Sequence, residues 1–585
     1  MFNKIYQTVT KYSNYVYYLI CISHIFFSLY LSKFFFKPIK DNVGFEIISY
    51  LNNDGIKTLN QDYFIKNVTK VYSYILSIII ILVFWYLVMS FIKRFKDNKP
   101  LFLIFLSIFI CGLIFILSTY PYFLVVEGTN DFTMNYVYAK EFMPMHWHGF
   151  FDNVFMCSNM IFFPHPFSLQ FIPYFFGCYL IFFFIYFIVN TIKINNYKIV
   201  FIMTIIIFVL PETIPAFITP GRNTTYAIFV LLYLVILIID YIYNVHICNI
   251  KYFVLVLIIS IIATWRSEGI IFLIISPLIF YILYINKKEY ILNKLNLVLF
   301  LLFFVIVFLL LKLPHDYGMK KYYNKDYLIV NTPMPLSAVF LSKDSNLSYK
   351  GFKKDLENIN SAYPTDYYYK WGGNASLRYN VENGRITRQC GTSFNQNKYI
   401  ISAYNVLINN YKIWFKKQAN NYLIANGFYR MFILPSSKYD NIEKYELNDN
   451  IIKYFKYTND YYIVGEMNIK NEYPLMSNNK YNKILSDYLL KIYRLTHRLS
   501  KQFCKYIKIV LTIFIFCYIF FSFIKKQYFD SLIAMNIISI FLAILVFSPD
   551  PHYEYYYATY LSQYLFVIYI LVKYILKKNY KRENI

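Results

Sequence analysis

Long apolar runs separated by short polar breaks are the main pattern along the chain. A helix that crosses the roughly 30 Å apolar core of a bilayer needs about 20 mostly apolar residues. About twelve runs approach or reach that length, and we expect each to form a membrane-spanning helix. They cover residues 14–32, 72–92, 100–119, 167–190, 198–217, 225–243, 252–264, 269–286, 293–313, 506–524, 529–547 and 556–576.

One long polar region, residues 314–505, separates the ninth run from the tenth. Its turn signals and mixed periodicity predict a soluble domain of mixed secondary structure. Apolar side chains at helical spacing predict one helix near 400–425. The chain therefore divides into an N-terminal membrane module at 1–313 with about nine helices, the inserted domain, and a C-terminal part at 506–585 with about three helices and a basic tail.

Composition supports an all-α polytopic membrane protein. The 585 residues are 58% hydrophobic and only 15% charged, which excludes a soluble globular class. The net charge of +26 comes largely from loops beside the runs and from a mildly basic inserted domain. We therefore expect a lipid bilayer as a partner and no nucleic acid. The eight cysteines are scattered without a CxxC spacing, so they predict neither a zinc ribbon nor a disulfide framework.

The distribution of Lys and Arg predicts the orientation of the runs. Cytoplasmic loops carry the excess of basic residues, and the loops alternate correctly if both termini are cytoplasmic. The loop at 33–71 is the one exception. In this orientation the domain at 314–505 and the charged breaks lie outside the cytoplasm.

Acidic side chains follow the third run, in the outer loop at 120–166. Asp131 and Glu127 are the first of them, and a carboxylate at this position could deprotonate a hydroxyl group or bind a metal near a phosphate. A solvated loop acid is the alternative.

The same outer loop contains a cluster of histidines. A helix that begins near His148 would bring its side chain next to Asp152 on one face. The apolar stretch 149–163 predicts a helix lying along the membrane interface. With His146 also present, a metal site is one interpretation, and hydrogen-bonded interfacial histidines are the other.

Two further breaks contain arginines. Arg222 lies where the sixth helix begins, and helix N-terminal amides beside an arginine suit an anion. A capped turn with a snorkelling arginine is the alternative. Arg266 and Glu268 would lie about 200° apart on a continuous helix. They reach one cavity only if the backbone breaks, which Gly269 permits.

A final charged segment precedes the last run. Asp550, His552 and Glu554 alternate, so an extended loop would place them on one side. By contrast, no charge falls at the middle of a predicted span, since Glu212 and Asp240 lie near span ends. Ion-coupled carriers usually hold ionisable groups near the bilayer midplane, so this pattern favours an enzyme over a carrier.

These features together resemble the GT-C superfamily of integral-membrane glycosyltransferases, in an uncharacterised bacterial branch. The matching segments are Tyr120-Pro121 through Asp131, the stretch His146–Pro166, Arg266-Ser267-Glu268-Gly269 and Pro551–Tyr557. The resemblance implies transfer of a sugar from polyprenyl phosphate or diphosphate to a glycan, lipid or protein acceptor. It also implies that the reaction takes place on the outer face of a bacterial inner membrane.

The resemblance implies a role for each candidate residue. Asp131, with Glu127 nearby, would be the catalytic base, and Arg266 and Arg222 would bind the donor phosphate. The residues expected to contact substrate are His146, His148, Asp152, Glu268, His552 and Glu554. A divalent metal, Mg²⁺ or Mn²⁺, is a further candidate.

Two alternatives remain open at this point. In the superfamily the catalytic acid usually follows the first helix, and the loop at 38–70 with Asp41, Glu46 and Asp54 occupies that position here. The function could also be that of an O-antigen-type polymerase or ligase, or of a transporter or flippase for lipid-linked glycans.

Overall fold

The structure is a computed structural model that describes most of the chain. The described residues are 13–36, 63–94, 98–120, 135–136, 139–143, 150–194, 196–219, 221–243, 249–282, 294–322, 332–362, 395–426, 480–547 and 553–583.

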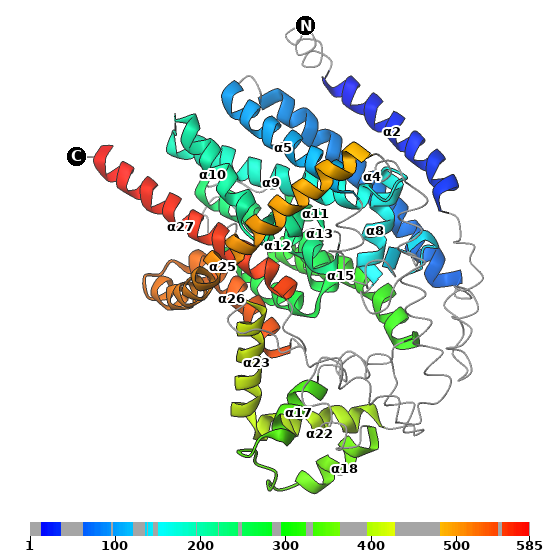
Figure 1. The fold of residues 1–585 in the computed structure, drawn as a ribbon, viewed down its shortest axis with the longest axis vertical. Helices are drawn as coiled ribbons and strands as arrows, with labels where there is room; N and C mark the ends of the chain where they lie inside the picture. Colours follow the sequence, from blue (N-terminus) through cyan, green and yellow to red (C-terminus); the bar gives the residue numbers. More distant parts are fainter. Residues whose placement is uncertain are drawn as a thin grey trace. The chain divides into compact units, whose positions relative to one another are not determined.

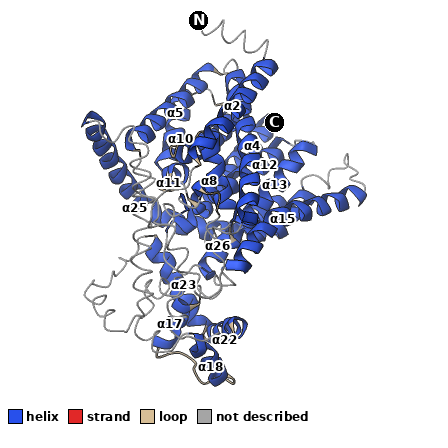
Figure 2. Cartoon of the chain, turned by 90° about the vertical axis from the view of Figure 1, so that its right-hand side faces the viewer, coloured by secondary structure: helices blue, strands red, loops and turns tan. Residues whose placement is uncertain are grey.

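Helices make up the regular structure of these residues, and no strand occurs among them (Figures 1 and 2). The elements in chain order are α2 (Ser13–Phe35), α4 (Tyr63–Arg94), α5 (Lys99–Thr119), α8 (Phe150–Phe162), α9 (Ser168–Ile192), α10 (Tyr197–Val209), α11 (Thr213–Ile218), α12 (Arg222–Tyr243), α13 (Asn249–Trp265), η2 (Ser267–Ile271), α14 (Phe272–Phe280), α15 (Lys294–Tyr322), α17 (Pro333–Leu341), α18 (Phe352–Ala362), α22 (Gln396–Asn409), α23 (Tyr411–Ala425), α25 (Lys480–Ile524), α26 (Tyr528–Phe547), η6 (Tyr553–Tyr556) and α27 (Tyr557–Glu583).

Within the described residues, 8 helices are long and apolar enough to cross a membrane. They are α2, α4, α5, α9, α12, α25, α26 and α27. Three shorter apolar helices cover Tyr197–Val209, Phe253–Trp265 and Glu268–Phe280, and α15 covers the remaining predicted run. The predicted all-α membrane class is confirmed at this level, while the number of twelve crossings and the orientation stay predictions.

The predicted run at 198–217 is not one continuous helix. α10 ends at Val209 and α11 begins at Thr213, with Leu210 outside the helical region between them (φ −55°, ψ 136°). Pro211 explains the break, because the residue before a proline is driven out of the helical region and proline has no N–H to continue the ladder. The break leaves Glu212 at the beginning of a short, buried helix.

The chain forms two compact units. The first comprises residues 1–318, 459–538 and 557–585, and the second comprises 319–458 and 539–556. In the first unit, α8 packs mainly against α4 and also contacts α2 and α9.

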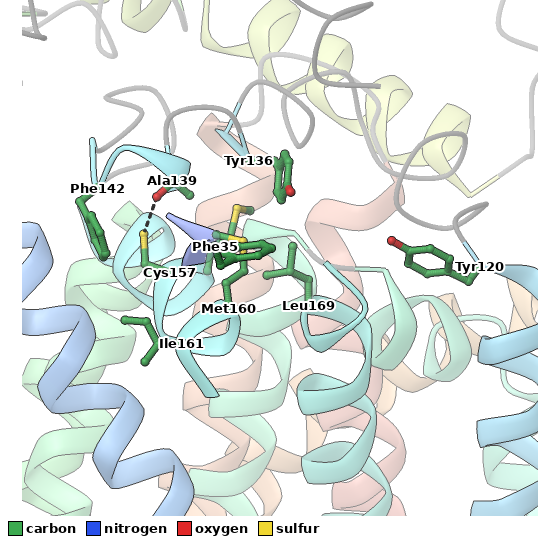
Figure 3. Packing of buried hydrophobic residues seen from close by; sticks show 10 residues of the cluster. Phe35, Tyr120, Tyr136, Ala139, Phe142, Cys157, Met160, Ile161 and Leu169 are labelled. Carbon is green, nitrogen blue, oxygen red and sulfur yellow. Dashed lines mark hydrogen bonds between the residues drawn. The ribbon is translucent and has the colours of Figure 1, made fainter. Parts of the chain in front are cut away.

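One apolar cluster joins α8 to the ends of α2 and α5 and to Tyr136, Ala139 and Phe142 (Figure 3). The Cys157 thiol donates a hydrogen bond to the carbonyl of Ala139 across this cluster, with 3.3 Å between sulfur and oxygen. The cluster therefore fixes part of the predicted outer loop against α8.

The described part of the second unit includes α17, α18, α22 and α23. The single helix predicted near 400–425 is wrong in detail, because α22 and α23 are separate and meet at Asn410. The Asn410 side chain accepts a hydrogen bond from Asn346 N at 2.6 Å and donates to Asn346 O at 3.2 Å. These contacts with another segment accompany the break in the helix. The prediction of mixed secondary structure stays a prediction, since residues 363–394 and 427–479 lie outside the described part.

Candidate functional site

Half of the residues predicted for the site are described by the structure. Asp152, Arg222, Arg266, Glu268 and Glu554 are described. Outside the described residues lie Glu127, Asp131, His146, His148 and His552. The geometry of the site is therefore built from α8, α12 and the break between α13 and α14.

Helix α8 is the central element of this region. Its 13 residues are all buried, and it runs beside α4 in the same direction. Two ring contacts mark this direction: Phe150 lies against Tyr72 and Phe162 lies against Phe84. The helix that the sequence predicts at 149–163 is present. Its packing beside Tyr72 and Phe84, inside the predicted span 72–92, and the burial of all its residues do not fit a helix that lies along the membrane interface.

Asp152, in the first turn of α8, has a clear structural contact. Its side-chain oxygen accepts a hydrogen bond of 2.9 Å from the Asn135 amide, and the Asn153 amide donates to Asn135 at 2.9 Å. A carboxylate at this position also interacts favourably with the positive end of the helix dipole. Asp152 therefore ties the segment at 135–136 to α8, and it stays a prediction as a substrate contact.

The predicted break between α13 and α14 is present, and it occurs at Arg266. This residue is extended, with φ −138° and ψ 149°, and η2 begins directly after it. A Cβ atom on Gly269 would lie 2.0 Å from the Ile262 carbonyl oxygen. Gly269 is therefore needed because η2 folds back tightly against α13.

The break brings the two charged side chains of this segment together. Arg266 Nε forms an ion pair with Glu268 Oε1, and each residue is only 7% exposed. The Arg266 guanidinium also lies over the ring of Tyr226 in α12, 5.8 Å from its centroid. Glu268 thus orients the arginine, and the pair faces α12.

Aromatic rings connect this pair to α8. The Trp265 ring contacts Phe151 and Phe155 of α8 and Phe229 of α12, with centroid distances of 5.4, 5.6 and 5.6 Å. α8, α12 and α13 therefore meet beside Arg266.

Two hydrogen-bond donors in this region have no partner among the described residues. They are the Trp265 Nε1 and Tyr226 Oη groups, both buried. A buried donor without a partner costs free energy, typically about 1–3 kcal/mol. Two such donors beside an arginine are suited to binding a ligand rich in oxygen atoms.

Arg222 begins α12, one turn before Tyr226, and lies near a residue that the sequence analysis did not select. That residue is His315 in α15, whose Nδ1 accepts a hydrogen bond of 3.3 Å from the backbone N–H of Phe150, the first residue of α8. This bond places the proton of a neutral imidazole on Nε2. The sequence signal was available, because Pro314-His315-Asp316 is a polar break of the same kind as the others.

His315 is held neutral. Burial lowers its pKa to about 4, and the nearby positive charge of Arg222 contributes in the same direction. A neutral Nε2–H and a positive guanidinium therefore lie near the N-terminal end of α8. The Nε2–H group, the guanidinium and the N-terminal end of the helix all attract anions.

The lowered pKa of His315 predicts a loss of stability in acid. In the unfolded chain the imidazole binds a proton near pH 6.5, so between about pH 6.5 and 4 the unfolded state binds more protons than the folded state. Stability should fall as the pH decreases through this window. Thermal midpoints measured at pH 7 and pH 5 should show a smaller decrease for His315→Gln than for the wild type.

The His315→Gln variant should still lose part of its stability between pH 7 and pH 5. Burial also lowers the pKa of His165 to about 4, and that contribution remains in the variant. Equal decreases in the two proteins would contradict the assignment to His315.

Glu554, the remaining described candidate, lies in η6, where it is half-buried. This element belongs to the second unit, so its position is described apart from the α8–α12–α13 region. The proposed role of Glu554 stays a prediction.

No three His, Cys, Asp or Glu side chains within the described ranges gather as a metal site. The two described acids of the first unit's candidate region, Asp152 and Glu268, are engaged by Asn135 and Arg266. These residues do not fit a metal-binding role, and the metal prediction for Asp131, His146 and His148 remains untested.

Charged pairs inside the helical unit were missed by the sequence analysis. Glu212 and Lys508 form an ion pair of 2.6 Å, and both side chains are at most 1% exposed. Asp530 pairs with Lys573 at 2.5 Å and also accepts a hydrogen bond from Tyr569. Glu212 falls near the end of a run in the sequence, but the helix break and the contact with α25 bury it.

Comparison with known proteins identifies no relative: no family model matches the chain, and no curated protein or solved structure is similar to it.

Proposed function

We propose that the chain is a membrane glycosyltransferase of the GT-C type, which transfers a sugar from a polyprenyl-phosphate or polyprenyl-diphosphate donor to a hydroxyl group of a glycan, lipid or protein acceptor. One observation carries this proposal. Residues from three separate sequence breaks, Arg222, Arg266 and His315, lie around α8 and α12. Positive charge and N–H donors in a buried setting are what a departing phosphate group requires.

The reaction follows from these groups. Asp131 takes the proton of the acceptor hydroxyl, and that oxygen attacks the anomeric carbon of the sugar. The bond from this carbon to the phosphate oxygen breaks, and the phosphate leaves with the electron pair. Arg266 and Arg222 stabilise the charge that grows on the leaving group. The Trp265 and Tyr226 donors bind oxygen atoms of the phosphate or the sugar.

The remaining predicted residues bind substrate in this proposal. His146, His148, His552 and Glu554 position the sugar or the acceptor, and the inserted domain holds the acceptor on the extracytoplasmic face of a bacterial inner membrane. The apolar helix surfaces accommodate the polyprenyl tail.

The direct test uses purified full-length protein in proteoliposomes with a polyprenyl-phosphate donor that carries a labelled sugar. Transfer of single labelled sugars to an acceptor supports the proposal. Formation of a labelled polymer instead would indicate a polymerase or ligase. Movement of intact donor between leaflets without transfer would indicate a flippase.

A transporter of lipid-linked glycans is the second candidate, because of the Glu212–Lys508 pair. Ionisable groups buried at a helix break are typical of transport pathways. The pair can also serve only to hold α25 in place, and the proteoliposome assay separates these two roles.

Replacement of Asp131 by Asn should reduce transfer by about a hundredfold or more, because a general base contributes about 10²–10⁴ to the rate. Expression and membrane insertion should not change, since the substitution preserves shape. Initial transfer rates should be compared with those of Asp41→Asn, Glu46→Gln and Asp54→Asn. A normal rate for Asp131→Asn together with a strong loss for one of the others would move the base to the loop at 38–70.

A further inference from the structure

Helix α25 is much longer than a membrane span requires. Its 45 residues extend over roughly 67 Å at 1.5 Å per residue, whereas the apolar core of a bilayer is about 30 Å thick. The apolar run of the sequence covers only 506–524, the C-terminal part of the helix. The N-terminal part, 480–505, therefore needs a different environment.

Exposed apolar side chains form one row along this N-terminal part. They recur every three or four residues, so they share one face of the helix. The row consists of Ile484, Tyr488, Ile492, Leu495, Leu499, Phe503 and Tyr506, each between 43% and 63% exposed apart from Phe503 at 75%. It continues without interruption into Val510 and Ile513 of the apolar run, which are also exposed. The surface that faces lipid in the span thus extends along the preceding turns.

Basic side chains form a second row beside the first. Lys491, Arg494 and Arg498 are exposed, and Lys505 is half-buried. At 100° per residue these four positions fall within a sector of roughly 60°, directly next to the apolar row. Asp487, the one acidic residue in the sequence of α25, falls in the same sector one turn before Lys491, so the band has four positive charges and one negative charge.

The rest of the unit lies on a different side of α25. Tyr493 contacts the ring of Phe115 in α5, and the Ser500 hydroxyl donates a hydrogen bond of 2.8 Å to the carbonyl of Val209 in α10. Both the apolar row and the basic row point away from these contacts.

We propose that α25 crosses the headgroup layer of the bilayer at the turns that carry Lys491, Arg494 and Arg498, and that it binds anionic phospholipid headgroups through these three side chains. A helix with an apolar face and a basic flank is suited to this position, where the apolar row enters the acyl boundary and the cations meet lipid phosphates. The continuity of the apolar row with the span indicates the same covering, namely lipid. Pairing with a second copy would be less favourable, because it brings together two positive bands.

This inference is independent of the proposed glycosyl transfer and is tested without a transfer assay. Full-length protein is reconstituted with spin-labelled phosphatidylglycerol or phosphatidylcholine in a phosphatidylcholine bilayer. The motionally restricted fraction of each label is measured by electron paramagnetic resonance. We expect the wild type to prefer phosphatidylglycerol by about threefold or more, and added salt should weaken this preference. No preference in the wild type would overturn the proposal.

The variant Lys491→Gln/Arg494→Gln/Arg498→Gln should prefer phosphatidylglycerol less than the wild type does, with the remaining preference coming from the basic loops and tail. The matched control is Lys350→Gln/Lys353→Gln/Lys354→Gln, which removes the same charge from exposed lysines at α18 and should keep the wild-type preference. Equal losses in both variants would overturn the proposal, because the effect would then follow from net charge alone. Efficient disulfide cross-linking between copies of Leu499→Cys, absent from the wild type, would also overturn it, because the apolar row would then be a protein interface.

Discussion

Neutralising both members of the Arg266–Glu268 pair, as Arg266→Gln with Glu268→Gln, is expected to lower glycosyl transfer by about a thousandfold while the fold is kept. The pair is almost fully buried, so replacing Arg266 alone would leave a buried carboxylate without its counter-charge. The double replacement avoids that cost, because two neutral amides can hydrogen-bond to each other. The loss of glycosyl transfer in the double variant then measures how much the positive charge stabilises the leaving phosphate. One such donor contributes about 10²–10³ to the rate.

The measurement compares initial transfer rates at saturating and at low donor concentration. The matched control is Glu212→Gln/Lys508→Met, which neutralises another buried pair of the same unit away from Arg266. That control should keep near wild-type transfer. If the control loses as much activity as the Arg266 and Glu268 variant, the loss reflects disturbed packing and Arg266 has no special role in transfer. Loss of donor translocation in the control would instead favour the transporter candidate.

Replacement of Lys508 alone by Met should destabilise the protein strongly, by about 3–5 kcal/mol. Lys508 Nζ lies 2.6 Å from Glu212 Oε1, and neither side chain is accessible to solvent. Removal of one partner leaves a buried charge uncompensated, whereas removal of both is often nearly neutral. The thermal midpoint of Lys508→Met should therefore fall well below that of the wild type, and Glu212→Gln/Lys508→Met should recover most of the difference.

Lys573→Met provides a graded comparison for this second prediction. Asp530 would keep its hydrogen bonds from Tyr569 and Tyr518, at 2.5 and 3.2 Å, after the lysine is removed. Lys573 is also 28% exposed, so solvent weakens its pairing. The decrease in midpoint should be smaller than for Lys508→Met. A double variant no more stable than Lys508→Met would show that the lysine is needed for packing rather than for charge.

The apolar pattern predicts helices well because each apolar run depends only on residues that are neighbours along the chain. All of the predicted runs coincide with helix in the described residues, and the break at Arg266 was expected from the charged dipeptide and the following glycine. The break at Leu210 was missed, although Pro211 marks it. Asn410 gave no comparable signal, since its role depends on contacts with a segment 64 residues away.

The candidate site was only partly accessible from sequence. Arg222, Arg266 and Glu268 were selected because charge within apolar sequence is costly and therefore informative. Trp265 and Tyr226 were not selected, since aromatic residues are abundant in this chain, and His315 was not selected although it lies in the polar break Pro314-His315-Asp316. Their importance arises from burial and, for Trp265 and Tyr226, from hydrogen-bond donors that have no acceptor among the described residues. Neither property can be read from neighbours along the chain.

The order of apolar and polar residues was sufficient to predict helices able to cross a membrane, which the described residues confirm, because a lipid environment demands long apolar segments whose backbone bonds are satisfied internally. Folding in three dimensions was needed to bring Arg266 to Tyr226, His315 to the first residue of α8, and Glu212 to Lys508. The last pair is separated by about half the chain in sequence. Such contacts depend on side-chain shape and on the crossing angle of the packed helices. The apolar periodicity of one helix does not specify which helix it packs against.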